Sequence, residues 1–169
     1  MSKMQVCFIG HRTIEKNEKL ISLLKETVVM LIGKGVIKFL FGSMSKFDDL
    51  ALQVVTDIKK EYPNIQRIYV RSANMFITKE YEEYLLKYYD QTYFLVKIEK
   101  AGKFSYVERN FEMIDKSTYC VFYYNEEYVP KIKKRSKDKI ELNLRRNSGT
   151  KIAYQYAVKK KEEIINLYK

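Results

Sequence analysis

Three short polar segments carry residue types that hold anions: Gly10-His11-Arg12, Phe41-Gly42-Ser43 and Ser148-Gly149-Thr150. The first two follow apolar runs that we interpret as strands, and the third opens the last expected helix. Small residues let a ligand approach the backbone closely. A helix N-terminus offers unpaired N–H groups and a partial positive charge. Together these segments predict a site for a phosphorylated ligand.

Asp48 lies just after the second segment, at the start of an expected helix. Its carboxylate suits hydrogen bonds from sugar hydroxyls. Capping of the helix by Ser45, Asp48 or Asp49 is an equal alternative. The spacing of lysine and hydroxyl residues here does not match a Walker motif, so a P-loop is excluded.

Arg109 and Asn110 lie on an expected helix before a strand. An arginine at this position suits a bidentate contact with phosphate. The residues alone favour a different interpretation, an ion pair on a solvated helix face with Glu108, Glu112 or Asp115.

His11 is the only histidine of the chain. Its ordinary pKa suits acid–base chemistry, but no orienting partner is visible in the sequence, so a binding or structural role is favoured over catalysis. The two cysteines, Cys7 and Cys120, fall in apolar runs and are expected to be reduced, buried thiols. One histidine and two distant cysteines form no zinc ligand set, and no metal is expected.

The elements that must position these residues alternate between strand and helix. This alternation predicts one α/β domain over residues 1–169, a Rossmann-like three-layer fold with a mainly parallel central sheet. The expected strands are Gln5–Ile9, Val36–Phe41, Gln66–Val70 and Thr118–Tyr123, with Gln91–Val96 either a strand or irregular. The expected helices are Glu15–Gly33, Phe47–Glu61, Tyr81–Tyr89, Tyr106–Lys116 and a closing helix over Ser148–Asn166.

The formal net charge is +11, and it is concentrated in a basic insertion at about 129–147. Residues Lys131–Arg146 hold eight basic and two acidic side chains, or +6 of that charge. This insertion and Lys159-Lys160-Lys161 favour weak, non-specific contact with nucleic acid as one alternative; a solvated loop is the commoner meaning of such a charge run. Within the insertion, alternating Ile140, Leu142 and Leu144 suit either a short edge strand or a loop.

No apolar run reaches membrane-spanning length. The residues Met1-Ser2-Lys3-Met4 lead directly into the first expected strand, which leaves no room for a signal peptide. We therefore expect a cytoplasmic protein without a membrane partner. Whether it forms a homo-oligomer stays open.

Four segments resemble the SLOG superfamily and, within it, the YpsA-like group of bacterial proteins. They are CFIGHR at 7–12, FLFGSMSKFDDLA at 39–51, YVERNFEMIDKSTYCVFYYNE at 106–126 and SGTKIAYQYA at 148–157. The resemblance covers most of the chain in the same order. It implies a Rossmann-like sheet that binds nucleotides or nucleotide-sugar derivatives at its carboxyl edge. Another superfamily member, the DNA-binding protein DprA, adds a nucleic-acid interpretation.

The same superfamily contains the LOG phosphoribohydrolases, which cleave the base from a nucleoside monophosphate. Their hallmark is a helix arginine followed, after a strand, by a PGGxGTxxE segment. Arg109 is similar to that arginine, and Gly149-Thr150 to the GT pair. Ile152-Ala153 stand where the acidic residues would be. The resemblance therefore implies nucleotide binding, while the carboxylate that an oxocarbenium-like transition state needs is missing.

The sequence thus predicts a sensor of a nucleotide or of an ADP-ribose-like or NAD-derived ligand, without chemistry of its own. A nucleotide hydrolase that uses Asp48, Asp115 or Glu112 is the alternative, and nucleic-acid binding is a third. Most of the 15 tyrosines and nine phenylalanines are expected in the core. Tyr123 and Tyr124, at the end of the last expected strand, are the candidates for stacking on a base.

Overall fold

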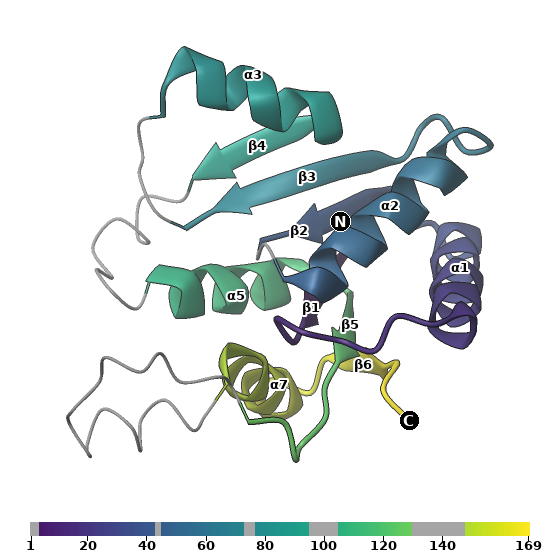
Figure 1. Ribbon diagram of the computed structural model, residues 1–169, viewed down its shortest axis with the longest axis vertical. Helices are drawn as coiled ribbons and strands as arrows, with labels where there is room; N and C mark the ends of the chain where they lie inside the picture. The colour runs from purple at the N-terminus through teal and green to yellow at the C-terminus, as the bar shows by residue number, and fades with distance from the viewer. Residues whose placement is uncertain (1–3, 43–44, 73–76, 95–104, 130–147) are drawn as a thin grey trace.

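A six-stranded sheet forms the centre of the computed structural model (Figure 1). All its strand pairs are parallel, in the order β4-β3-β2-β1-β5-β6. The structure describes residues 4–42, 45–72, 77–94, 105–129 and 148–169. The predicted α/β, Rossmann-like fold is confirmed. The strands are β1 (Gln5–Gly10), β2 (Lys38–Phe41), β3 (Gln66–Arg71), β4 (Gln91–Phe94), β5 (Tyr119–Tyr123) and β6 (Glu163–Asn166).

Five helices flank the sheet within the described ranges. Four of them begin at a polar capping residue whose side-chain oxygen accepts an N–H from the first turn, and these caps are Asn17, Ser45, Thr78 and Ser148. Local sequence therefore sets where these helices start. The helices are α1 (Glu18–Gly33), α2 (Lys46–Lys59), α3 (Lys79–Tyr88), α5 (Ser105–Lys116) and α7 (Gly149–Lys159).

Alternate residues of the strands point to opposite faces of the sheet and build two separate cores. On one face, Phe8 and Phe41 stack with ring centroids 5.1 Å apart, beneath α1 and α2. On the other face, Cys7 and Phe122 pack against residues of α5 and α7. The sheet thus lies between two helical layers, as a three-layer fold requires.

The direction in which strands are added reverses between β1 and β5. From β1 to β4, each new strand joins the same side of the sheet; β5 then pairs with the other side of β1, and β6 extends that side. In open α/β sheets, ligands bind outside the carboxyl ends of the strands at such a reversal. The carboxyl ends of β1 and β5 carry Gly10 and Tyr123, which are register partners.

The predicted closing helix over Ser148–Asn166 is wrong in its second half. Helix α7 ends at Lys159, Lys161 takes a positive φ of 57°, and β6 then runs parallel to β5. The reason is the open edge of β5: pairing with Glu163–Asn166 satisfies its backbone groups, and the N–H of Leu167 donates to Phe122 O at 2.8 Å. The segment predicted as either strand or irregular contains β4.

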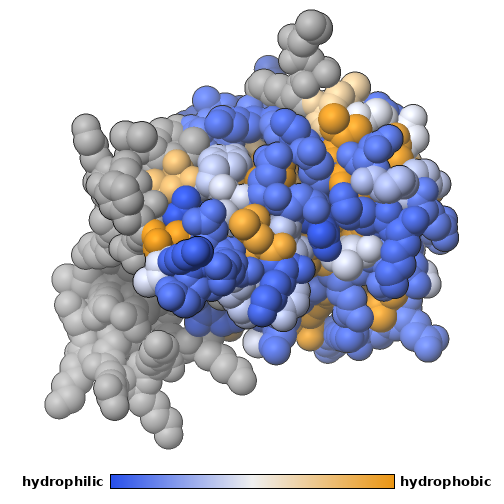
Figure 2. Space-filling model, turned by 90° about the horizontal axis from the view of Figure 1, so that it is seen from above, coloured by the Kyte–Doolittle hydropathy of each residue, from blue (hydrophilic) through white to orange (hydrophobic). Residues whose placement is uncertain are grey.

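Ser43, Val96 and most of the basic insertion, with its alternating Ile140, Leu142 and Leu144, lie outside the described residues. Figure 2 shows a face that is mostly hydrophilic, with apolar side chains in small separate groups. Within the described ranges, no helix combines the length and apolar character that crossing a bilayer needs.

Candidate functional site

The predicted binding residues fall into three groups at the carboxyl edge of the sheet. Gly42, Asp48, Arg109 and Asn110 form one group after β2. Gly10 and His11 form a second group after β1. The N-terminus of α7 is the third, and it neighbours the start of α5: a Cβ on Gly149 would lie 3.5 Å from the Tyr106 ring.

Arg109 is the charged residue at the centre of the first group. It occupies the second turn of α5, and only 5% of it is exposed. Its Nη1 donates to Ser72 Oγ at 3.1 Å, and Nε and Nη2 donate to Asn110 Oδ1 at 3.4 and 3.3 Å. The expected ion pair on a solvated face is wrong, because the amphipathic α5 turns this side chain inward to pack over Gly42.

Gly42 is required here by close packing. A Cβ at this position would lie 2.6 Å from Met113 Sδ and 2.7 Å from Arg109 Nε. Its backbone N–H donates to Asp48 Oδ2 at 3.3 Å. The glycine therefore lets the Arg109 side chain and the Asp48 carboxylate both approach the backbone at the end of β2.

The structure distinguishes the two roles considered for Asp48, helix capping and a carboxylate that faces the site. Ser45 caps α2, its Oγ accepting the Asp48 N–H at 3.0 Å. The Asp48 carboxylate is instead turned toward Gly42 and is 2% exposed. Burial lowers the pKa of Arg109, and the negative charge of Asp48 opposes that effect. The group thus combines a buried cation with a buried carboxylate.

His11 links the ends of β1 and β5. Its Nε2 accepts the backbone N–H of Asn125 at 2.8 Å, and its ring stacks on Tyr128 at 3.9 Å. Burial lowers the pKa of His11 to about 4, so the ring is neutral at pH 7 and carries its proton on Nδ1. Nδ1 is buried and has no hydrogen-bond partner among the described residues. This geometry supports the structural role, since no carboxylate of the described residues orients the ring as in a general base.

The neighbours of His11 have different roles. The absence of a side chain at Gly10 leaves space for Phe47, because a Cβ on Gly10 would lie 2.3 to 2.5 Å from three Phe47 atoms. Arg12 is exposed, and its backbone carbonyl accepts the Lys46 N–H at 3.0 Å. Within the described residues, the requirement for glycine at position 10 thus comes from packing inside the protein.

Ser148 caps the N-terminus of α7. Ser148 Oγ accepts the Lys151 N–H at 3.0 Å, and Thr150 is 6% exposed. Ala153 lies in the core beneath α7 with 1% exposure. The first turn of this helix therefore offers backbone donors and a hydroxyl, and no carboxylate occurs from Ser148 to Ala153.

The carboxylates proposed for a hydrolase do not gather at one place. Asp115 lies near the end of α5, about 9 Å along the helix axis from Arg109 at 1.5 Å per residue. Both its oxygens accept the Tyr156 hydroxyl, at 2.8 and 2.9 Å. Among the described residues, no three His, Cys, Asp or Glu side chains come close enough to share a metal ion.

Several residues of this edge were not predicted from the sequence. Ser72, directly after β3, holds Arg109, and Asn125 and Tyr128 hold His11. Polar residues within two positions of a strand end were the available signal for Ser72 and Asn125. The predicted stacking residues are already engaged: Tyr123 stacks on Phe47 at 5.7 Å, and Tyr124 on Tyr154 at 4.4 Å.

The thiols of Cys7 and Cys120 are free and fully buried, as predicted. They are register partners on β1 and β5. A hydrogen bond with Cys7, and then burial, raise the pKa of the Cys120 thiol. Burial of both thiols keeps them out of contact with reagents in solution.

A comparison of the chain with protein-family models and with curated proteins finds no match. The resemblance to the SLOG superfamily therefore stays a prediction.

Proposed function

We propose that the chain binds a nucleotide or a nucleotide-derived ligand of the ADP-ribose or NAD type, with Arg109 as the contact to phosphate. The observation that carries the proposal is a buried guanidinium that forms no ion pair within 4.0 Å among the described residues. Burying a cation without a direct ion pair is costly, and the nearby charge of Asp48 only partly opposes the effect of burial. An anionic ligand at this place would offset that cost.

The hydrogen bonds of Arg109 leave capacity for such a ligand. A guanidinium has five N–H donors, and Arg109 forms three hydrogen bonds to Ser72 and Asn110. Two N–H groups thus have no partner among the described residues. Guanidinium N–H groups of this kind form charge-assisted hydrogen bonds with phosphate oxygens.

The surroundings support phosphate and sugar rather than an isolated inorganic ion. Helices α5 and α7 both begin at this edge of the sheet, where their N-termini favour negative charge (Figure 1). The buried carboxylate of Asp48 suits the hydroxyls of a ribose. The Rossmann-like topology and the resemblance of the segments around Arg109 and Ser148 to the SLOG superfamily add to this choice of ligand.

We propose binding or sensing without catalysis. Ile152 and Ala153 occupy the positions where LOG enzymes carry acidic residues. His11 is neutral and held by Asn125 and Tyr128. The side chains of Ser72 and Asn110, which accept hydrogen bonds from Arg109, do not exchange protons near neutral pH.

Thermal shift with AMP, ADP-ribose, NAD and inorganic phosphate tests the proposal. A ligand at about 100 times its Kd stabilises the native state by ~2.7 kcal/mol, which raises Tm by about 5–10 °C for a chain of this size. Arg109→Met should lose the shift. Lys25→Met removes the same charge from an exposed position on α1 and should retain it.

Equal shifts in the Arg109→Met and wild-type proteins would refute the proposed contact, as would the absence of a shift with every compound. Chromatography of each nucleotide after incubation with the protein separates binding from hydrolysis. Release of free base that depends on Arg109 would replace the sensor by a LOG-like hydrolase.

A further inference from the structure

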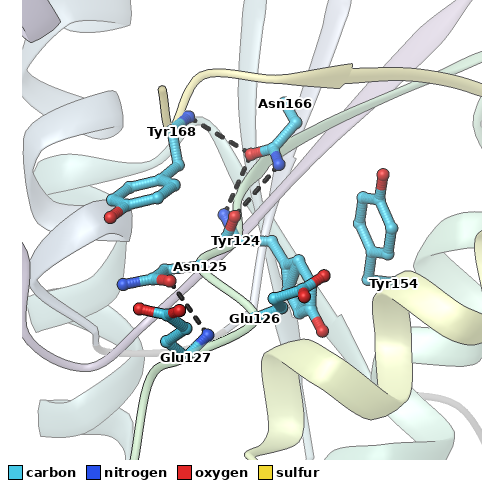
Figure 3. Close-up of a pocket in the computed structure, with 7 residues that line it drawn as sticks. All are labelled: Tyr124, Asn125, Glu126, Glu127, Tyr154, Asn166 and Tyr168. Atoms are coloured by element: carbon cyan, nitrogen blue, oxygen red, sulfur yellow. Dashed lines mark hydrogen bonds between the residues drawn. The ribbon is translucent and has the colours of Figure 1, made fainter.

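A concave site lies at the carboxyl ends of β5 and β6, apart from the group around Arg109. It is an open pocket of about 370 Å³ between α7 and the C-terminal residues (Figure 3). Tyr154 and Tyr168 stand on opposite sides of it, and the segment after β5 runs between them. The lining residues are Tyr124, Asn125, Glu126, Glu127, Tyr154, Asn166 and Tyr168.

The walls of this pocket are fixed by hydrogen bonds and stacking. Asn166 donates to Tyr124 O at 3.0 Å, and its Oδ1 accepts the N–H groups of Tyr124 and Tyr168 (Figure 3). Asn125 Oδ1 accepts the Glu127 N–H at 2.9 Å. The rings of Tyr124 and Tyr154 are stacked at 4.4 Å and 8°. A preformed site of this kind binds without a large ordering cost.

The charge of the pocket is opposite to that of the chain. Its lining contains two carboxylates, Glu126 and Glu127, and no lysine, arginine or histidine, whereas the chain carries +11. Neither carboxylate forms an ion pair within 4.0 Å among the described residues. Burial, and then the charge of Glu126, raise the pKa of Tyr124, so its phenol is neutral at pH 7. The pocket therefore disfavours phosphate.

Tyrosine rings elsewhere in the chain already hold cations. Lys34 lies over Tyr119 at 5.6 Å, Lys116 over Tyr93 at 5.4 Å, and Lys160 over Tyr156 at 5.5 Å from the ring centroids. No described cation lies over the three pocket tyrosines in this way. The three rings and the two carboxylates thus form one aromatic and anionic surface.

We propose that this pocket is a binding site for an organic cation, an alkylammonium or guanidinium group with an apolar body. Tyrosine faces attract such a group through their negative quadrupole, and they also cover its carbon atoms. The carboxylates supply the countercharge. This site is independent of the nucleotide proposal, because none of its residues belongs to the group around Arg109.

Two probes of equal shape and different charge test the site. Choline carries a quaternary ammonium, and 3,3-dimethylbutan-1-ol is its uncharged isostere; agmatine adds the guanidinium. NMR of the protein with ¹³C-labelled tyrosine rings, at constant ionic strength, follows Tyr124, Tyr154 and Tyr168, assigned through single Tyr→Phe variants. Choline should shift these resonances saturably and bind roughly tenfold more tightly than the alcohol.

Matched variants separate the pocket from the net charge. Glu126→Gln with Glu127→Gln should weaken choline binding several-fold, and Tyr154→Leu should weaken it with both carboxylates retained. Glu82→Gln with Glu83→Gln, on the exposed face of α3, removes the same charge and should leave binding unchanged. Equal affinity for choline and the alcohol, equal loss in both double variants, or non-saturating shifts would each overturn the proposal.

Discussion

Replacing Gly10 by alanine tests how tightly β1 packs against α2. The added Cβ would lie 2.3 Å from Phe47 Cδ2, 2.4 Å from Cγ and 2.5 Å from Cβ. Carbon atoms in contact prefer about 3.5–4.0 Å, so Phe47 must withdraw by more than about 1 Å. Phe47 is fully buried in the first turn of α2, and its ring stacks on Tyr123. The phenylalanine cannot withdraw without moving the helix.

Overpacking of this kind lowers the free energy of unfolding by about 2–3 kcal/mol. For a chain of this length, the corresponding decrease in Tm is about 5–10 °C. Gly33→Ala is the matched control, because no heavy atom lies within 4 Å of its Cβ position and its φ is not positive. Alanine at the end of α1 should raise stability by about 0.5–1 kcal/mol.

Urea unfolding followed by circular dichroism measures both variants, because the chain has no tryptophan. We expect the midpoint of Gly10→Ala to decrease and that of Gly33→Ala to increase, with unchanged slopes. A Gly10→Ala protein within about 0.5 kcal/mol of the wild type would refute the argument. The glycine would then not be required by contact with Phe47.

Three further predictions concern stability. The pKa of His11 is lowered to about 4 in the folded state, so the unfolded state binds a proton first as the pH falls. The free energy of unfolding should therefore decrease between about pH 6.5 and pH 4. The urea midpoints at pH 7 and pH 4.5 should differ less in His11→Gln than in the wild type. Asp90→Asn should lower the free energy of unfolding by about 1 kcal/mol. Asp90 lies just before β4 and accepts hydrogen bonds from the backbone and side chain of Arg67 on β3. A variant as stable as the wild type would contradict this prediction. Tyr156→Phe should cost about 1 kcal/mol in thermal unfolding, because it leaves Asp115 without the hydroxyl that both its oxygens accept.

The sequence by itself determined the fold class and most of the elements. Short apolar runs such as Gln5–Ile9 are strands because both their faces are buried between helical layers. Capping residues such as Ser45 and Ser148 mark helix starts, because they satisfy backbone donors of their own first turn. Both effects act over a few neighbouring residues, so the sequence alone predicts them.

The direction of a polar side chain was decided only when the elements packed. The sequence placed Arg109 among Glu108, Glu112 and Asp115 and favoured a surface ion pair. Docking of α5 on the sheet instead buries Arg109 against Gly42 and Ser72, which come from the ends of two other strands. His11 likewise obtains Asn125 and Tyr128 only through the pairing of β1 with β5.

The last residues of the chain also show the difference between what local sequence predicts and what packing decides. The apolar residues of Glu163–Asn166 fit the continuation of a helix as well as a strand. The open edge of β5 makes them a strand, because its backbone groups need partners that a helix would not supply. The pocket beside Tyr154 exists only because β6 and Tyr168 then reach the end of β5. Contacts between residues distant in sequence depend on which surfaces meet, and only the tertiary structure fixes that.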